Sequence, residues 1–442
     1  MSNIQNGQIA FVIGDGYYGL SNPANINNNP ALAIDSGLTK IAKNMKRILE
    51  KMGFSKVIYV SISGHPHQPL EGIAYHVGNQ PGNPNHPDPY ERLNAIEKFD
   101  KLVEQFKPTL VVSVHDLWML FQVSLSAYRE NFTWVQYDPV EADYYPQTVV
   151  YSLPNNPNIQ PLPIVDVLKN ANYVIAYNTF GAQGLKAMGR EPNKCIHNGI
   201  NPKEIYEIDN KQVLLDRRRA IGVQDDWLMF FHMGRNSVRK RPDIMLEAWF
   251  KFTKLVEATK QPLKAKFYVH TDRYSFNGFD IPSIIKRLGI EKSVVMPSEL
   301  NFSADDLNIF YNASDIYVGL PGGEGHGLGF SEAMYLGKPL VYGCYGGHIT
   351  YCKGAGIEVP AIQFLSEQNI DAPRAVISST KAAQAMFDLY SSPELRKQYG
   401  DVGKEIARKE LLWEILDPKF EEAFSEALSE AKTSSIFAKK VL

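Results

Sequence analysis

Short runs of β-branched and aromatic residues alternate along this chain with longer segments in which apolar residues recur at helical spacing. This alternation predicts an α/β protein in which helices cover parallel sheets. The strands expected in the first half are residues 9–13, 57–61, 110–114, 132–136 and 173–176. Those expected in the second half are residues 228–231, 267–269, 294–296, 316–320 and 340–342.

Several helices are marked by their own signals. Residues 38–52 place apolar side chains on one helical face and end at Gly53. Pro242 suits the first turn of a further helix. Ser303, with Asp306 three residues on, predicts a capping box at the start of another.

The two series of strands indicate two doubly wound domains, because 442 residues are too many for one ordinary core. We expect a first domain over residues 1–205, a second over 206–402 and a helical tail over 403–442. A charged segment, 211–220, separates the two series of strands. Two such domains in series place a ligand cleft between the carboxyl ends of both sheets.

Two segments rich in Asn, Gly and Pro, 14–36 and 64–90, interrupt the first domain and indicate functional loops or insertions. The second contains His65 and His67, a spacing that could bind a metal ion. No cysteine or carboxylate cluster adjoins this pair, so exposed loop histidines are the simpler interpretation.

Residues 321–334 contain a glycine-rich turn that joins the expected strand 316–320 to an expected helix over residues 330–336. Glycine lets a backbone approach a ligand closely, and the start of the next helix offers N–H groups and partial positive charge to a phosphate. Glu324 in the turn and Glu332 in the helix can each accept hydrogen bonds from sugar hydroxyls. This pattern predicts a nucleotide-sugar site; the alternative is that both glutamates are solvated.

A basic segment, 234–243, follows the first strand of the second domain. Arginine offers a planar fork to phosphate oxygens and lysine a compact charge, so the basic side chains of this segment could neutralise a departing diphosphate. The sequence leaves open whether Lys240, the adjacent Arg241 or both reach the phosphates. The alternative is a solvated basic turn.

Glu324 and Glu332, with seven residues between them in a glycine-rich turn, resemble the paired-glutamate signature of retaining glycosyltransferases with the GT-B fold. Glycosyltransferase family 4 (glycosyl transferases group 1) is the most similar family, and Arg235 and Lys240 match its diphosphate-binding pair. The resemblance implies two Rossmann-like, doubly wound domains that face a central cleft. The first would bind the acceptor, the second the nucleotide sugar, and the C-terminal helix would cross back to the first. It is good over residues 170–347 and weak before Gly37 and in the segment 64–90.

The resemblance also implies roles for individual residues. Glu332 would bind the ribose of the donor. The donor phosphates would be bound by Arg235, Lys240, Arg241, Gly37, Gly327, Leu328 and Gly329. The donor sugar would be bound by Glu324, Gly325, His326 and Gly327, although relatives often have an apolar residue in place of His326.

Relatives carry a catalytic-site histidine or aspartate in the first domain. Two candidates follow expected strands here, His115 and Asp138. Tyr137 stands where many relatives have a histidine, so Asp138 is the preferred polar group near the reacting centre, together with Glu324. For His115, a loop histidine with satisfied hydrogen bonds is an equally good interpretation.

The net charge of −2 gives no argument for a nucleic-acid partner or an anionic membrane. Three widely spaced cysteines argue against a disulfide framework and suit a reducing compartment. No apolar run approaches the roughly 20 residues that span a bilayer, and no signal peptide is evident. We therefore expect a cytoplasmic protein, for which peripheral membrane contact stays open.

The sequence thus predicts a retaining glycosyltransferase that moves a sugar from a UDP-, GDP- or ADP-sugar to a hydroxyl of a glycan or another acceptor. It contains no Asp-x-Asp pair, so we expect neither a metal ion nor another cofactor. One alternative is an inactive nucleotide- or sugar-binding module of a glycan-assembly complex. Another is a nucleotide-sugar epimerase on the same scaffold.

Overall fold

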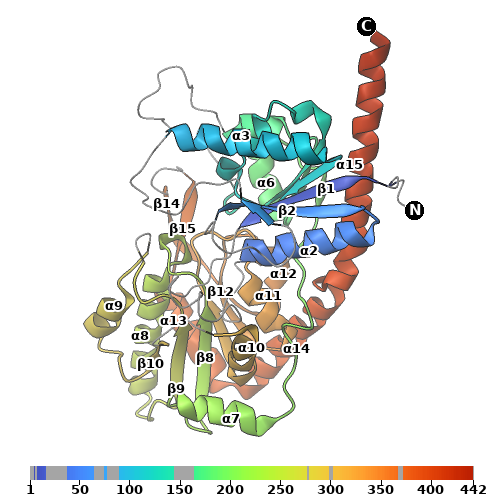
Figure 1. Ribbon diagram of the computed structural model, residues 1–442. Coiled ribbons are helices and arrows are strands. Elements are labelled where there is room, and N and C mark those ends of the chain that lie inside the picture. Colours follow the sequence, from blue (N-terminus) through green and yellow to red (C-terminus); the bar gives the residue numbers. More distant parts are fainter. Residues whose placement is uncertain are drawn as a thin grey trace.

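The computed structural model describes residues 4, 7–15, 37–63, 74–76, 89–143, 164–275, 278–297, 302–366 and 372–441 (Figure 1). Its first sheet is parallel and has the strand order β3-β2-β1-β4-β5-β6-β7. These strands are β1 (Ile9–Asp15), β2 (Lys56–Ser63), β3 (Ala74–His76), β4 (Leu110–Ser113), β5 (Thr133–Asp138), β6 (Tyr173–Ala176) and β7 (Lys194–Cys195).

The second sheet is also parallel, in the order β10-β9-β8-β11-β12-β13, and an antiparallel hairpin, β14-β15, adjoins it. Its strands are β8 (Leu228–Met233), β9 (Ala265–His270), β10 (Val294–Val295), β11 (Ile316–Gly319), β12 (Leu340–Gly343) and β13 (Gly356–Val359). The hairpin consists of β14 (Ala361–Ser366) and β15 (Pro373–Ile377). The predicted α/β class with two doubly wound sheets is confirmed. Each expected strand exists, whereas the sequence did not predict the short strands β3 and β7 or the strands β13 to β15.

Helices connect the strands and cover both sheets (Figure 1). They include α2 (Gly37–Lys51), α3 (Pro89–Phe106), α4 (Phe121–Ser124), α5 (Ile164–Lys169), α6 (Thr179–Ala187), α7 (Lys211–Ala220), α8 (Pro242–Ala258) and α9 (Ile281–Leu288). Later in the chain follow α10 (Ala304–Ala313), α11 (Leu328–Tyr335), α12 (Ile349–Cys352), α13 (Ser379–Ser391), α14 (Pro393–Glu410) and α15 (Trp413–Val441). The local signals are confirmed, since Pro242 starts α8 and Ser303 and Asp306 form a capping box on α10.

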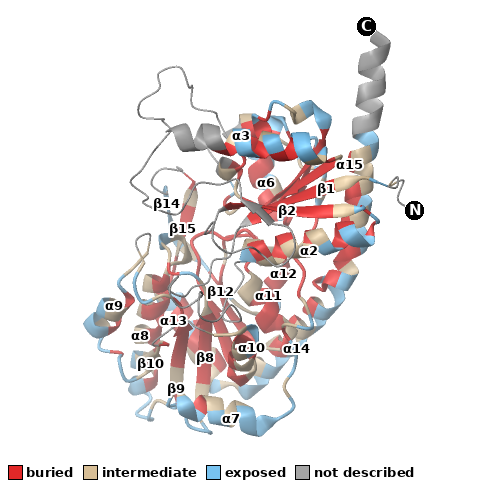
Figure 2. Ribbon diagram, viewed as in Figure 1, coloured by how far each residue is buried: buried red, intermediate tan, exposed pale blue. Residues whose placement is uncertain are grey.

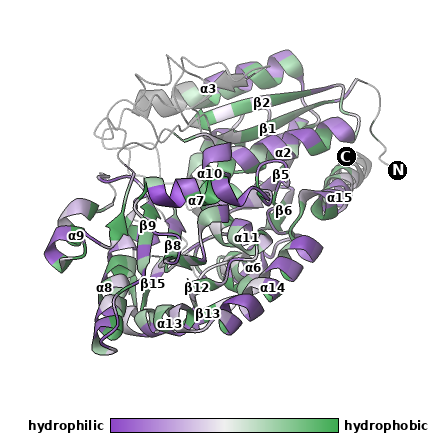
Figure 3. Cartoon of the chain, turned by 90° about the horizontal axis from the view of Figure 1, so that it is seen from below, coloured by the Kyte–Doolittle hydropathy of each residue, from purple (hydrophilic) through white to green (hydrophobic). Residues whose placement is uncertain are grey.

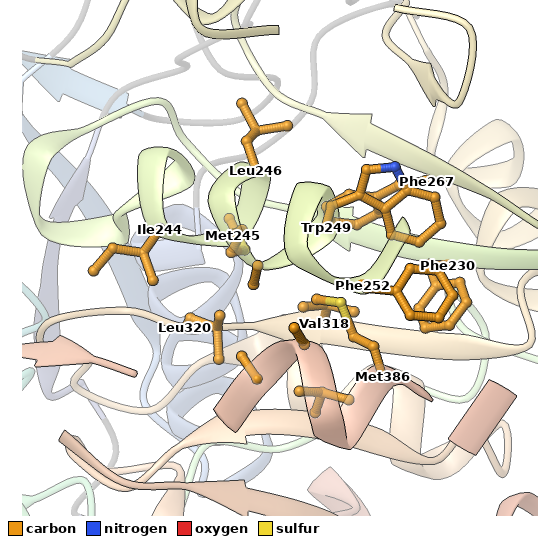
Figure 4. Close-up of a cluster of buried hydrophobic side chains, with 14 of the residues drawn as sticks. Phe230, Ile244, Met245, Leu246, Trp249, Phe252, Phe267, Val318, Leu320 and Met386 are labelled. Atoms are coloured by element: carbon orange, nitrogen blue, oxygen red, sulfur yellow. The ribbon is translucent and has the colours of Figure 1, made fainter. Parts of the chain in front are cut away.

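Both sheets are buried on their two faces, which is why their strands are continuously apolar (Figure 2). Phe11 of β1 belongs to one core cluster and its neighbour Val12 to another, as the alternation of side chains along a strand requires. In the second sheet, Phe230 packs with Trp249 and Phe252 of α8 and with Met386 of α13 (Figure 4). Polar residues concentrate on outer helices such as α7 (Figure 3).

The final helix, α15, packs against the first sheet although it follows the second in the chain (Figure 1). Phe420 is fully buried, with its ring 5.0 Å from that of Tyr137 on β5. Arg47 of α2 forms an ion pair of 2.7 Å with Asp417 of α15. The chain ranges proposed for the domains stay a prediction. Among the described residues, no helix combines the length and the apolar character needed to cross a bilayer.

The strand order reverses beside one strand in each sheet. β1 lies between β2 and β4, and β8 lies between β9 and β11. The connections that leave such neighbouring strands diverge to opposite faces of the sheet, so a crevice opens beyond their carboxyl ends. Candidate site residues lie at or after the ends of β1, β4, β5, β8 and β11. Residues 16–36 of the first long segment, and most of the segment 64–90 with His65 and His67, lie outside the described residues.

We predict that Phe420→Ala lowers the free energy of unfolding by about 3–5 kcal/mol, because it leaves a cavity between α15 and the first sheet. Urea denaturation followed by tryptophan fluorescence measures this, since Trp413 lies 5.9 Å from Phe420, ring to ring. Lys419→Ala, at an exposed position of the same helix, should change stability by less than about 0.5 kcal/mol. Equal effects of the two substitutions would contradict this packing.

Candidate functional site

A cavity of about 310 Å³ lies between the two sheets, at their carboxyl ends. Segments from both halves of the chain line it, so neither domain contains the site alone. The first domain contributes Gly37, Lys40, Asp116, Glu141 and Asn198, among others. The second contributes Arg235, Arg239, Lys240, Glu324, His326 and Glu332, together with the glycines of the turn before α11.

The glycine-rich turn joins β11 to α11, and its residues line this cavity. Gly327 adopts a φ of +87°, which side chains rarely allow, and so directs the chain into the first turn of α11. Gly323 has no room for a side chain, because a Cβ there would meet a nitrogen of Arg374 at 2.4 Å and the carbonyl oxygen of Glu141 at 2.5 Å. The helix starts at Leu328, two residues before the expected Phe330, so its N-terminus opens directly onto the cavity.

Glu324 is buried in this turn beside two cations. Lys240 donates a short hydrogen bond to its carboxylate, and Arg239 reaches the same oxygen at 3.4 Å. Burial would raise the pKa of Glu324, but the charges of Lys240 and Arg239 outweigh burial and lower that pKa to about 2. Glu324 is therefore ionised at neutral pH and can accept hydrogen bonds.

Glu332 lies one turn into α11 and faces the same cavity. Its carboxylate accepts a hydrogen bond of 2.6 Å from Tyr311 and lies 3.8 Å from the ammonium group of Lys40 on α2. Burial raises the pKa of Glu332, and Lys40 and Tyr311 oppose that rise. The two glutamates of the motif thus converge on one cavity but have different surroundings.

The basic segment after β8 divides into residues that line the cavity and one that does not. Arg235, Arg239 and Lys240 line it. Arg241 instead adopts a left-handed conformation, with φ of +51°, and forms an ion pair of 2.7 Å with Asp243 at the start of α8. The structure therefore places Lys240, and not Arg241, at the cavity, and it adds Arg239, which the sequence analysis did not single out.

Asp138 and His115, the two candidates of the first domain, are buried and do not line the cavity. Asp138 ends β5 at 2% exposure, and burial, with Asp116 as a second cause, raises its pKa well above the usual range. His115 is buried, and its Nδ1 accepts a hydrogen bond of 2.8 Å from the backbone N–H of Asp116. Neither is among the residues that line the cavity, whereas Asp116 and Glu141 are. Asp116 follows β4 and Glu141 follows β5. Their positions just beyond the carboxyl ends of strands could have identified them as candidates.

The remaining predicted residues meet at the start of α11. A Cβ at Gly37, the first residue of α2, would lie 3.4 Å from Leu328, so the N-termini of α2 and α11 approach each other. Gly325, Gly327 and Gly329 line the cavity with them. The buried ring of His326 lies 4.8 Å from Tyr351 and 5.8 Å from His197, centre to centre.

The expectation of a site without a metal stays a prediction. Within the described part of the chain, no group of three His, Cys, Asp or Glu side chains could hold an ion. The cavity instead combines its cations with the N–H groups of α11, which suit a phosphate without an ion between them.

No family model matches the chain. A curated relative, an uncharacterised glycosyltransferase of Methanocaldococcus jannaschii, is 29% identical over 160 residues. That match covers 36% of this chain and 38% of the relative, so this chain spans well under half of the relative's length.

Solved structures are similar over nearly the whole chain. Sucrose-phosphate synthase of Thermosynechococcus elongatus superposes with a TM-score of 0.67 at 17% identity, covering 96% of this chain and 99% of that one. A glycosyltransferase of Rickettsia africae gives 0.65 at 15% identity, with coverage of 96% and 99%. HepE of Anabaena, solved with UDP-glucose, gives 0.63 at 14% identity, with coverage of 95% and 99%.

The chain has the GT-B fold. The resemblance to group 1 glycosyltransferases, based on the glutamate pair and the basic segment, is confirmed. In this fold the cavity between the sheets is the cleft that the sequence analysis expected between two Rossmann-like domains.

We predict that Lys240→Met lowers the free energy of unfolding at neutral pH by about 3–5 kcal/mol, because it takes the nearest cation from the buried carboxylate of Glu324. The pKa of Glu324, about 2, lies below its ordinary value of 4.5. The stabilisation is therefore present above about pH 4.5 and is lost as the pH falls toward 2. The difference between the native chain and the variant, measured by urea denaturation, should shrink over that range.

The double variant Lys240→Met/Glu324→Gln provides the control for this pair. It removes both charges, so it should recover much of the stability that the single substitution loses. If the effects of the two substitutions simply add, the two side chains do not interact as described.

Proposed function

We propose that this chain is a retaining glycosyltransferase, which transfers a sugar from a nucleoside diphosphate sugar to an acceptor hydroxyl without a metal ion. One observation carries the proposal. A single interdomain cavity brings the cations of the β8 turn and the N-terminus of α11 together with two buried glutamates. The first set of groups suits a diphosphate and the second suits sugar hydroxyls.

The diphosphate becomes the leaving group in this reaction, so its developing charge must be stabilised. Arg235 and Lys240 supply positive charge, and the start of α11, at Leu328 and Gly329, supplies backbone N–H groups that face the cavity. These groups lie on a rigid strand-to-helix framework, and therefore need little reorganisation as the glycosidic bond breaks. Leaving-group stabilisation of this kind does not require a divalent cation.

The two glutamates are assigned different parts of the donor. Glu332, next to Lys40 at the helix, would accept hydrogen bonds from the ribose. Glu324, in the turn, would accept them from the transferred sugar, together with the backbone at Gly325, His326 and Gly327. The ionised state of Glu324 at neutral pH supports that role.

Retention is proposed from the resemblance to group 1 glycosyltransferases. The double displacement of retaining glycosidases uses a carboxylate as its nucleophile. Glu324, the carboxylate of the glycine-rich turn, is already bound to Lys240 and Arg239. A same-face displacement, in which the departing phosphate accepts the proton of the acceptor hydroxyl, is therefore the proposed route. Asp116 and Glu141 are the first-domain carboxylates that line the cavity. They replace Asp138 and His115 as the polar groups proposed to face the acceptor side.

The donor nucleotide is addressed by a thermal-shift panel. HepE was solved with UDP and glucose, and starch synthase IV of Arabidopsis with ADP and acarbose, so uridine and adenine nucleotides come first, followed by GDP. A ligand that binds only the folded chain raises its melting temperature by mass action. Release of free nucleoside diphosphate in the presence of glycan acceptors then separates a transferase from an inactive binding module. Binding without turnover would favour the module.

The proposed diphosphate contacts can be tested by substitution, and Arg241 provides a matched control. Arg235→Ala and Lys240→Ala should each weaken binding of the nucleoside diphosphate by about 1.5–3 kcal/mol, because a charge-assisted hydrogen bond is lost. Arg241→Ala, which removes a cation that pairs with Asp243 outside the cavity, should leave the affinity nearly unchanged. Titration calorimetry measures all three. A larger loss in the Arg241 variant would show that the basic turn rearranges on binding.

Metal independence gives a second prediction. Transfer from the donor chosen by the panel should continue in excess EDTA, because the diphosphate charge is met by Arg235, Lys240 and the start of α11. The rate should be measured before and after addition of Mg²⁺ and Mn²⁺ to the chelated enzyme. Activity that disappears in EDTA and returns with either ion would reject the proposed charge assignment.

A further inference from the structure

The carboxylate of Glu141 connects the first domain to the cations of the second. It follows β5, and its Oε1 lies 2.8 Å from Nη2 of Arg239. Its Oε2 lies 3.6 Å from Nη2 of Arg374 on β15, and its backbone oxygen accepts a hydrogen bond of 3.0 Å from Nη1 of the same arginine. All three residues are mostly buried, with side-chain exposures of 16%, 21% and 8% for Glu141, Arg239 and Arg374.

Arg239 is shared between the two domains. Its Nη1 donates to the backbone oxygen of Gly323 at 2.7 Å and lies 3.4 Å from Glu324, while its Nη2 reaches Glu141. Both ends of its guanidinium fork are thus already used by protein acceptors. A phosphate oxygen that binds the Nη atoms of Arg239 therefore competes with these acceptors.

Glu141 is the acceptor that is easiest to replace. The Gly323 contact is a backbone bond within the turn, and Glu324 is bound to Lys240 as well. Glu141 retains Arg374 when it loses Arg239, so its displacement does not leave it without a cation. A diphosphate also adds negative charge close to Glu141 and Glu324, and crowded carboxylates and phosphates do not all stay ionised.

We infer that the Glu141 carboxylate pairs with Arg239 before a donor binds, and that a donor diphosphate displaces it from Arg239 and leaves it protonated. Binding of the donor is then coupled to uptake of a proton from solvent by Glu141. The only bond formed is the O–H bond of Glu141, and the buffer supplies its proton. The inference rests on the proposed function, since it requires a sugar nucleotide to bind in this cavity.

The charges around Glu141 agree with this coupling. Burial raises the pKa of Glu141 to about 7, Arg239 and Arg374 oppose the rise, and the neighbouring Asp116 and Glu324 add to it. Loss of Arg239 to a phosphate removes an opposing charge and adds a like one, so the pKa of Glu141 rises further. Above about pH 7, Glu141 is therefore ionised before the donor binds and neutral in the complex.

The test is calorimetric titration of the full chain with UDP-glucose, and with ADP-glucose and GDP-mannose, at about pH 8 in buffers of different ionisation enthalpy. The dependence of the apparent enthalpy on the buffer gives the number of protons taken up. A sugar nucleotide is a suitable probe because its diphosphate lacks the ionisation near pH 6 that a terminal phosphate has. We expect uptake of up to one proton per donor in the native chain and none in Glu141→Gln.

Two further variants keep the test independent of how well Glu141→Gln folds. Arg374→Gln should reduce the uptake, because loss of Arg374 raises the pKa of Glu141 and so increases the fraction that is protonated before the donor binds. Asp143→Asn changes a carboxylate on the same loop, which accepts a hydrogen bond from Tyr345 and has no cation partner within the described part of the chain. It should leave the uptake unchanged.

The outcomes separate the inference from the proposed function. Binding without proton uptake, or uptake that persists in Glu141→Gln, would overturn the role of Glu141 while leaving a sugar-nucleotide site intact. If none of the three sugar nucleotides binds, the proposed function and the inference fall together.

Discussion

The need to balance buried charge across an interdomain cleft governs the site of this protein. Glu324, Lys240, Arg239 and Glu141 are all largely removed from water, and an ion in such a place is stable only beside an opposite charge. The four side chains come from three segments, after β5, β8 and β11. Their mutual neutralisation therefore ties the position of the first domain to that of the second. Under the proposed function, a diphosphate enters this balance as a further anion, so its binding and the charge state of the cleft would be coupled.

The backbone makes this charge arrangement possible. The turn between β11 and α11 brings Glu324 against Lys240 only because its glycines let it pass close to Arg374 and to the loop that carries Glu141. The positive φ of Gly327 then starts α11 at the cavity. Each feature has a physical reason that is independent of the ligand, yet together they bring the start of α11 and the cations of the β8 segment to one cavity.

Lys240 and Arg241 show how two adjacent side chains can have different surroundings. Both are basic and adjacent in the chain. The left-handed conformation of Arg241 turns its side chain toward Asp243 at the start of α8, and Lys240 points to Glu324 instead. A similar distinction applies after β5. Asp138 still belongs to the strand and is enclosed by it, whereas Glu141 has left the sheet and reaches the cleft.

The sequence by itself determined the fold class, nearly all of the central strands, the α10 cap and the segments that form the site. These follow from local patterns, because strand burial, helix capping and glycine-rich turns are encoded within a few residues of one another. Only the tertiary structure decided which polar side chains share the cavity. Arg239 and Arg374, the partners of Glu141, are 98 and 233 positions away from it in the chain. Contacts over such separations leave no periodic pattern in the sequence. Contacts of that kind depend on how two sheets meet at their carboxyl ends, and the meeting is fixed by the packing of whole domains.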